Sequence, residues 1–317
     1  MDYQAIRSQY KSRTQLESLA AGLSLTTKSL REKQIAVQSA HDAEMDKVRA
    51  EAAREAVLSS LEYASRIQKS ILPPESVFRR AFKDFSILWH PRDIVSGDIY
   101  WIRSFDEGTM LCVCDCTGHG TPGALLTMLV TSAFGIIVNE HTYKDPARII
   151  RMLDDRLSSA LYDSSSGDER DISDIKDGCD IAVLYVSKSG EVTFSSANFP
   201  IFICDGNEVT QIKGQKLFVG EGKLSDDIEV KTTTIPANPN NVFYISSDGM
   251  FDQRGGARRL PFGYSIFKKI ILESCNEPQQ AISDKIWNAF EEYRGGEPRK
   301  DDFELVSFKP RVQGADV

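Results

Sequence analysis

The segment of residues 109–130, TMLCVCDCTGHGTPGALLTMLV, constrains the fold more than any other part of the sequence. The run from Thr109 to Cys114 is apolar and β-prone, and it ends at Asp115. A glycine-rich loop follows, and the residues from Gly123 to Val138 are apolar at a density typical of a buried helix. A carboxylate at the end of a strand suits a metal ligand, so we predict that Asp115 is the chemical centre of the protein.

Three other segments also place an aspartate at the edge of an apolar run. They are GDIYW with Asp98, SSDGM with Asp248, and KDDFELVSF with Asp301 and Asp302. No histidine lies at metal-ligand spacing, so Mg²⁺ or Mn²⁺ fits these acids better than zinc does. A single Asp-Gly after a strand is more often a turn signal than a site. Four such acids at separate strand ends instead predict a two-metal hydrolase that needs no protein nucleophile.

Charge and apolar content exclude several classes of protein. The chain has 38 Lys and Arg against 46 Asp and Glu, a net charge of −8, which argues against a nucleic-acid surface. It contains no membrane segment of about 18 or more uncharged apolar residues, and the N-terminus lacks the apolar core of a signal peptide. The six cysteines lack the paired spacings of a zinc site or a small disulfide scaffold. We therefore expect a cytoplasmic protein with free thiols.

Three of these cysteines alternate along the strand that leads to Asp115. On a strand Cys112, Cys114 and Cys116 would share one face. We expect core packing for them, with a redox or metal role as the alternative.

Residues 1–57 are polar, free of proline and typical of a long helix. Four apolar residues recur every seven positions, at Leu16, Leu23, Leu30 and Val37. This resembles a coiled coil, although the pattern fails at Glu44 and Glu51. Two interpretations remain open: a regulatory coiled coil that forms a homodimer, or an amphipathic helix that packs on its own domain.

Residues 58–74 predict a second amphipathic helix, a linker that ends at Pro73 and Pro74. Its expected apolar side holds Leu61, Ala64, Ile67 and Ile71. The position between the N-terminal segment and the remaining chain suits a helix that transmits a signal. A plain connector is the alternative.

Residues 75–310 predict one domain, followed by a tail at 311–317. Strands are followed by two helices at 123–140 and 145–162, then strands, two helices at 262–274 and 278–294, and a last strand at 303–308. An acidic loop is expected at 163–177. Because the order does not alternate strand and helix, we predict an α+β fold with antiparallel sheets covered by helices.

Five motifs in order resemble the SpoIIE-type, RsbU-like serine phosphatases of the protein phosphatase 2C (PPM) superfamily. They are GDIYW, DCTGHGTPGALLTMLV, DGCDIAVLYV, ISSDGMFDQ and DDFELV, within about residues 60–309. The resemblance implies a central antiparallel β-sandwich flanked by helix pairs, with two metal ions at one edge. It also implies metal ligands: Asp115 as the bridging ligand, Asp98 on one ion, the backbone carbonyl of Cys116, and Asp248 and Asp301 on the other ion.

The resemblance assigns supporting roles to three more residues. Asp302 stands where the superfamily often has Asn, so we expect it to support the ligands. For Asp180 two roles stay open, help to a weaker third metal or a buried structural acid. For His119 we expect a mainly structural role in the glycine loop, with proton donation to the leaving serine oxygen as the alternative. Glu304 departs from the family, which often has Thr there, and would repel a phosphate if it faced the site.

The resemblance implies hydrolysis of phosphoserine or phosphothreonine on a small regulatory protein by a hydroxide that bridges two metal ions. The implied substrate is an anti-sigma-antagonist (STAS) domain in a bacterial partner-switching pathway. The alternative is a non-catalytic, phosphatase-like adaptor that binds a phosphoprotein and dimerises through its helices. A nucleotide-binding enzyme is disfavoured because no G-x-G-x-x-G or Walker sequence occurs.

Overall fold

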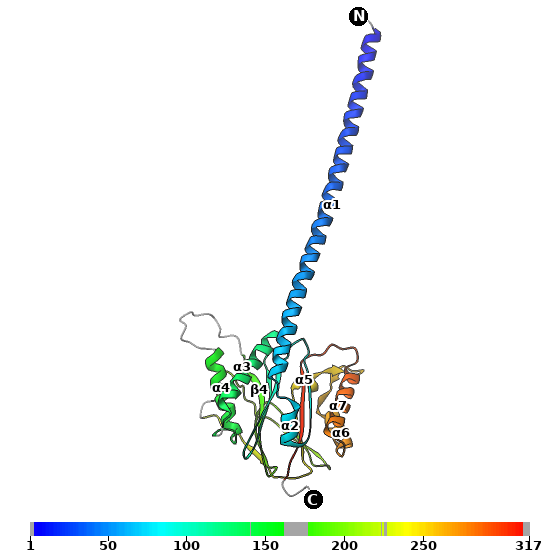
Figure 1. Ribbon diagram of the computed structural model, residues 1–317. Coiled ribbons are helices and arrows are strands. Elements are labelled where there is room, and N and C mark those ends of the chain that lie inside the picture. The colour runs from blue at the N-terminus through cyan, green and yellow to red at the C-terminus, as the bar shows by residue number, and fades with distance from the viewer. Residues whose placement is uncertain (1–2, 140, 162–176, 223, 225–226, 313–317) are drawn as a thin grey trace. The chain divides into compact units, whose positions relative to one another are not determined.

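The computed structural model describes residues 3–139, 141–161, 177–222, 224 and 227–312 (Figure 1). The chain divides into two compact units, residues 1–60 and Leu61–Val317. Helix α1 (Tyr3–Ile71) is continuous through the division and ends before Pro73, as predicted. Within the described residues, no helix is both long enough and apolar enough to span a membrane.

Among the described residues, the first unit is the part of helix α1 up to Ser60. The four apolar residues at seven-residue spacing, Leu16, Leu23, Leu30 and Val37, have side chains that are 62–70% exposed. Their stripe is therefore available to another helix.

The second unit contains two five-stranded antiparallel sheets packed face to face (Figure 1). The first sheet has the order β1 (Phe82–His90), β12 (Phe303–Pro310), β9 (Val242–Ser246), β6 (Ile201–Cys204) and β7 (Val209–Ile212). The second has the order β2 (Asp98–Phe105), β3 (Gly108–Cys116), β4 (Cys179–Ser187), β5 (Val192–Ala197) and β8 (Thr233–Ile235). A separate two-stranded sheet pairs β10 (Arg254–Gly255) with β11 (Leu260–Pro261).

A pair of helices covers the outer face of each sheet (Figure 1). Helices α3 (Thr121–Ile137) and α4 (Pro146–Leu161) pack on the β2–β8 sheet. Helices α6 (Gly263–Ser274) and α7 (Gln279–Arg294) pack on the β1–β7 sheet. The α+β sandwich flanked by helix pairs is thus confirmed. The short helices α2 (Glu75–Ala81) and α5 (Asp248–Asp252) were not predicted, because helices this short carry too little periodicity.

The alternation of side chains along strand β3 explains how the layers are built. Leu111 and Val113 face the core between the two sheets. Cys112, Cys114 and Cys116 face the opposite way and pack with α3 and α4. All three thiols are buried and free, so the prediction of core packing is confirmed.

The C-terminal turns of α1, which belong to the second unit, bury a face that overlaps the predicted one, with Leu61, Ala64 and Ile71 half-buried. Ile67 is 39% exposed, whereas Ser65 and Gln68 are buried. The prediction counted only apolar residues, and here a polar side chain occupies the buried position. Most of the predicted acidic loop at 163–177 and most of the tail at 311–317 lie outside the described residues.

Candidate metal centre

Three of the predicted aspartates form one row across the β2–β8 sheet. The strand register places Asp98 of β2 opposite Asp115 of β3, and Asp115 opposite Asp180 of β4. Residues directly opposite in antiparallel strands project from the same face. Because Tyr100, Val113 and Ala182 continue that face into the core between the sheets, the three acids face the other sheet.

Two further aspartates lie close to the ends of the neighbouring strands β9 and β12 of the other sheet. Asp248 is the first residue of α5, directly after β9, and Asp301 lies just before β12. Burial, followed by the charges of Asp98, Asp248, Asp301 and Asp180, raises the pKa of Asp115 well above its usual value. Asp115 is therefore surrounded by the acids that the sequence motifs singled out.

The electrostatics of the cluster fit a divalent cation. Burial, then the charges of Glu304 and Asp302, raise the pKa of Asp98, which is only 2% exposed. Asp248 is exposed, but desolvation by the surrounding protein, together with the charges of Asp252 and Asp301, raises its pKa to about 6. Each carboxylate makes its neighbours harder to ionise, and a bound cation would reverse that effect. Carboxylate oxygens are also the donors that Mg²⁺ and Mn²⁺ prefer.

The acids fit a divalent cation in the chemistry of their donor atoms and in their charge, but they do not form a complete coordination shell. Among the described residues, no group of three His, Cys, Asp or Glu side chains is arranged to hold a metal ion as it stands. The backbone carbonyl of Cys116, another predicted donor, lies beside Gly97, since a Cβ on Gly97 would stand 3.0 Å from that oxygen. The described donors are thus gathered at one edge of the sandwich.

Asp302 holds the loop that precedes Asp98. Its Oδ1 accepts a hydrogen bond from the backbone N–H of Arg92 at 2.6 Å, and its Oδ2 accepts one from Gly97 at 2.7 Å. The residue is buried, and burial raises its pKa. Both oxygens are engaged with the backbone, which favours the expected supporting role.

Two glycines permit close packing of the segments that carry the acids. A Cβ on Gly97 would lie 2.6 Å from the carbonyl oxygen of Gly118 in the glycine loop. A Cβ on Gly249 would lie 1.9 Å from the carbonyl oxygen of Asp302. Any side chain at either position would push an aspartate-bearing segment away, which explains the glycine beside Asp98 and beside Asp248.

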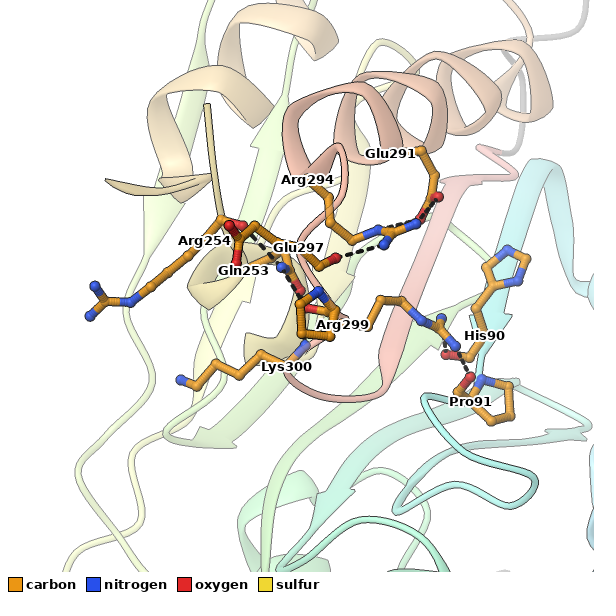
Figure 2. Close-up of polar contacts among 10 residues, drawn as sticks. His90, Pro91, Gln253, Arg254, Glu291, Arg294, Glu297, Arg299 and Lys300 are labelled. Carbon is orange, nitrogen blue, oxygen red and sulfur yellow. Dashed lines mark hydrogen bonds and ion pairs between the residues drawn. The ribbon is translucent and has the colours of Figure 1, made fainter. Parts of the chain in front are cut away.

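Two residues that the sequence analysis did not identify brace the segment before Asp301 (Figure 2). Gln253, which is 2% exposed, accepts a hydrogen bond from the N–H of Lys300 and donates to the carbonyls of Arg254 and Pro298. Arg299 donates to the carbonyls of His90 and Pro91. The segments carrying Asp248, Asp301 and Asp98 are thereby tied together. No local sequence pattern marks either residue, because both form hydrogen bonds with backbone groups that are distant in the sequence.

Gln68 of α1 is a third residue that was missed. It is fully buried; its Nε2 donates to the carbonyl of Ser96 at 2.7 Å and to the hydroxyl of Thr127 at 2.9 Å. Its Oε1 accepts from the N–H of Ser96 at 3.0 Å, and the Ser96 hydroxyl accepts from the N–H of Asp98. The linker helix therefore contacts both the Asp98 loop and helix α3.

The two remaining candidates have structural partners. Asn198 donates to the Asp180 carboxylate at 2.6 Å and to the carbonyl of Leu217 at 2.7 Å. His119 is exposed, and its Nδ1 lies 3.0 Å from the Asp93 carboxylate in the loop before Asp98. These contacts favour a structural acid and a structural histidine.

Comparison with known proteins agrees with the motifs and the fold. The family model for stage II sporulation protein E (SpoIIE) matches residues 106–311. The chain belongs to the SpoIIE family. It is also 31% identical to the SiaA-PP2C domain of Pseudomonas aeruginosa, with a TM-score of 0.73, covering 82% of this chain and 99% of that domain. The resemblance proposed from the sequence is thus confirmed.

More distant structures share the fold. The phosphatase domain and regulatory fragment of SpoIIE from Bacillus subtilis is 18% identical, with a TM-score of 0.53 over 71% of this chain and 62% of that one. The RsbU and RsbW domains of a Mycobacterium tuberculosis protein are 14% identical, with a TM-score of 0.56 over 73% of this chain and 61% of that one. No curated protein matches the chain.

Proposed function

We propose that this protein is a metal-dependent phosphatase that removes phosphate from a phosphoserine or phosphothreonine. The observation that carries the proposal is the position of Asp115, which lies in register with Asp98 and Asp180 and within the electrostatic field of Asp248 and Asp301. Membership of the SpoIIE family and the likeness to the SiaA-PP2C domain support it.

Asp98, Asp115, Asp248, Asp301 and the carbonyl of Cys116 would hold two Mg²⁺ or Mn²⁺ ions. When bound, such ions supply an activated water molecule and neutralise charge on the phosphoryl oxygens. The chain itself positions the donors: Asp302 and Gln68 hold the Asp98 loop, while Gln253 holds the segment of Asp301. Such preorganisation matters because a misplaced donor loses most of its electrostatic effect.

Exposure of the acids indicates the direction from which substrate approaches. Asp98 is buried, Asp115 and Asp301 are half-buried, and Asp248 is exposed. A phosphorylated side chain would therefore approach from the Asp248 side. We propose that this side chain belongs to a small regulatory protein with a STAS-type fold, in a partner-switching pathway.

We also propose that the N-terminal helix forms a homodimer. Its support is the exposed seven-residue stripe of Leu16, Leu23, Leu30 and Val37. Deleting residues 1–57 should convert a dimer to a monomer in light scattering coupled to gel filtration. A truncated protein with the oligomeric state of the full chain would refute this part of the proposal.

The phosphatase proposal is tested by hydrolysis of p-nitrophenyl phosphate and of a phosphorylated STAS protein. Turnover should require Mn²⁺ or Mg²⁺, stop with chelator, and fall sharply in Asp248→Asn, which nearly keeps the shape of the side chain. Asp284→Asn on the exposed part of α7 is the matched control and should retain activity. A folded protein without turnover in any metal would instead favour the phosphoprotein-binding adaptor.

A further inference from the structure

Glu304 is the one acid among the buried side chains that have polar atoms without a hydrogen-bond partner in the described residues. It lies on β12, its side chain is fully buried, and neither carboxylate oxygen has a hydrogen-bond partner among the described residues. Buried polar groups without partners are rare in folded proteins, and each requires a physical explanation. A threonine or an apolar residue at this position would avoid the cost of burying an unpaired carboxyl.

The alternation along β12 shows where this side chain points. Phe303 and Leu305 pack with α6 and α7, whereas Val306 and Phe308 pack in the core between the sheets. Glu304 shares the side of Val306 and Phe308 because side chains on a strand alternate. It therefore points between the sheets, toward the face that carries Asp98 and Asp115, and not toward the solvent side from which a phosphate would approach.

Ser247 links the backbone of Glu304 to Asp98 by hydrogen bonds. The Ser247 hydroxyl donates to Oδ2 of Asp98 at 2.7 Å and accepts from the backbone N–H of Glu304 at 3.1 Å. The N–H of Ser247 donates in turn to the carbonyl of Glu304 at 3.1 Å. One serine thus separates the backbone of Glu304 from the carboxylate of Asp98.

The ionisable neighbours that act on Glu304 are acids. Burial, then the charges of Asp115 and Asp302, raise the pKa of Glu304 well above its usual value. Among the neighbouring charges, that of Glu304 contributes most to the raised pKa of Asp98. A cation shared with Asp98 and Asp115 is the partner that would compensate this group.

We propose that Glu304 is an additional carboxylate of the divalent-cation site and strengthens its affinity for the metal. The inference rests on the proposed function only in requiring that the acids bind a cation. The affinity of oxygen-donor sites for divalent cations rises with the number of charged ligands. Glu304 therefore makes this site tighter for Mn²⁺ or Mg²⁺ than the four aspartates alone would be.

The test is calorimetric titration of the purified, chelator-treated full-length chain with Mn²⁺. Glu304→Gln removes the charge and nearly keeps the shape, and it should weaken Mn²⁺ binding by about 10–100-fold. Glu304→Thr is the second variant, because threonine suits a strand. Glu297→Gln, in the segment before Asp301 and paired with Arg259, is the matched control and should keep wild-type affinity.

Thermal unfolding with chelator and with Mn²⁺ separates a role at the metal from a role in packing. Without metal, Glu304→Gln should unfold at or above the temperature of wild type, because the buried carboxyl has no hydrogen-bond partner among the described residues that the substitution would remove. With Mn²⁺, the metal-induced shift should be smaller than in wild type.

Wild-type Mn²⁺ affinity and an unchanged metal-induced shift in both Glu304 variants would overturn the inference and leave Glu304 a buried neutral acid. If Asp248→Asn loses affinity in the same titration while Glu304→Gln keeps it, the metal site stands without Glu304. If wild type binds no Mn²⁺, the inference and the metal dependence of the proposed function both fail.

Discussion

The two halves of the acidic cluster are built in different ways. Asp98, Asp115 and Asp180 belong to three adjacent strands, and the hydrogen-bonded ladder sets their register. Asp248 and Asp301 lie outside their strands, where Gln253 and Arg299 hold the neighbouring backbone. The ladder half should therefore tolerate changes around it, whereas the second half depends on a few side chains that can be removed singly.

The largest effect is expected from the acids themselves. Asp115→Asn and Asp248→Asn should each lower kcat/KM by at least about 100-fold, the scale of losing one preorganised electrostatic group. Asp115→Asn should be the more severe, since Asp115 interacts with acids of both halves. Steady-state kinetics at saturating Mn²⁺ measures this, beside the control Asp284→Asn. Near wild-type kinetics in Asp115→Asn would remove it from the centre of the site.

Gln253→Ala should disturb only the half of the cluster that contains Asp248 and Asp301. Its loss leaves the N–H of Lys300 and the carbonyl of Pro298 without their partner, so the segment before Asp301 should loosen. We expect kcat/KM to fall by about 10–100-fold, as for other residues that orient metal ligands. Mn²⁺ affinity should fall with it. Gln38→Ala on the exposed part of α1 is the control, and equal kinetics in the two variants would show that the brace is dispensable.

Gln68→Ala tests the half of the cluster that is set by the strand ladder, because Gln68 contacts the loop before Asp98 from helix α1. Its hydrogen bonds to Ser96 and Thr127 are buried, so their loss should cost about 1–3 kcal/mol of unfolding free energy. Because the β2–β3 ladder still places Asp98, activity should fall less than in Gln253→Ala. Urea unfolding and steady-state kinetics should be measured on the same preparation of each variant, Gln68→Ala and Gln253→Ala. A larger loss of activity in Gln68→Ala than in Gln253→Ala would reverse the proposed difference between the halves.

The smallest expected effect is the change with pH in the stability of the metal-free protein. The pKa of Asp248 is raised from its usual 3.8 to about 6, so the folded, metal-free protein binds this proton more tightly than the unfolded chain does. The stabilisation is complete below the unfolded pKa and is lost as pH rises through about 6. Chelator-treated protein should therefore gain stability from pH 7 to pH 5, measured by urea unfolding.

Mn²⁺ binding should show the opposite trend, because a metal requires deprotonated ligands. Affinity should decrease as pH falls below about 6, where Asp248 becomes protonated. Asp248→Asn should flatten the stability profile of the chelated protein. An unchanged profile in that variant would assign the titration to other acids of the cluster.

The sequence by itself determined the α+β class, the long N-terminal helix, the main helix pairs and the family. These depend on short-range patterns: the strand, loop and helix of 109–130, and aspartates at the edges of apolar runs. It also singled out the acids that the structure brings around Asp115.

Only the tertiary structure decided how those acids are supported. Gln68, Gln253 and Arg299 act on backbone that is distant in the chain, so no local pattern marks them. The direction of Glu304 likewise depends on which face of β12 meets the other sheet. Periodicity predicts that a strand has two faces, but only packing against other elements decides which face becomes the site.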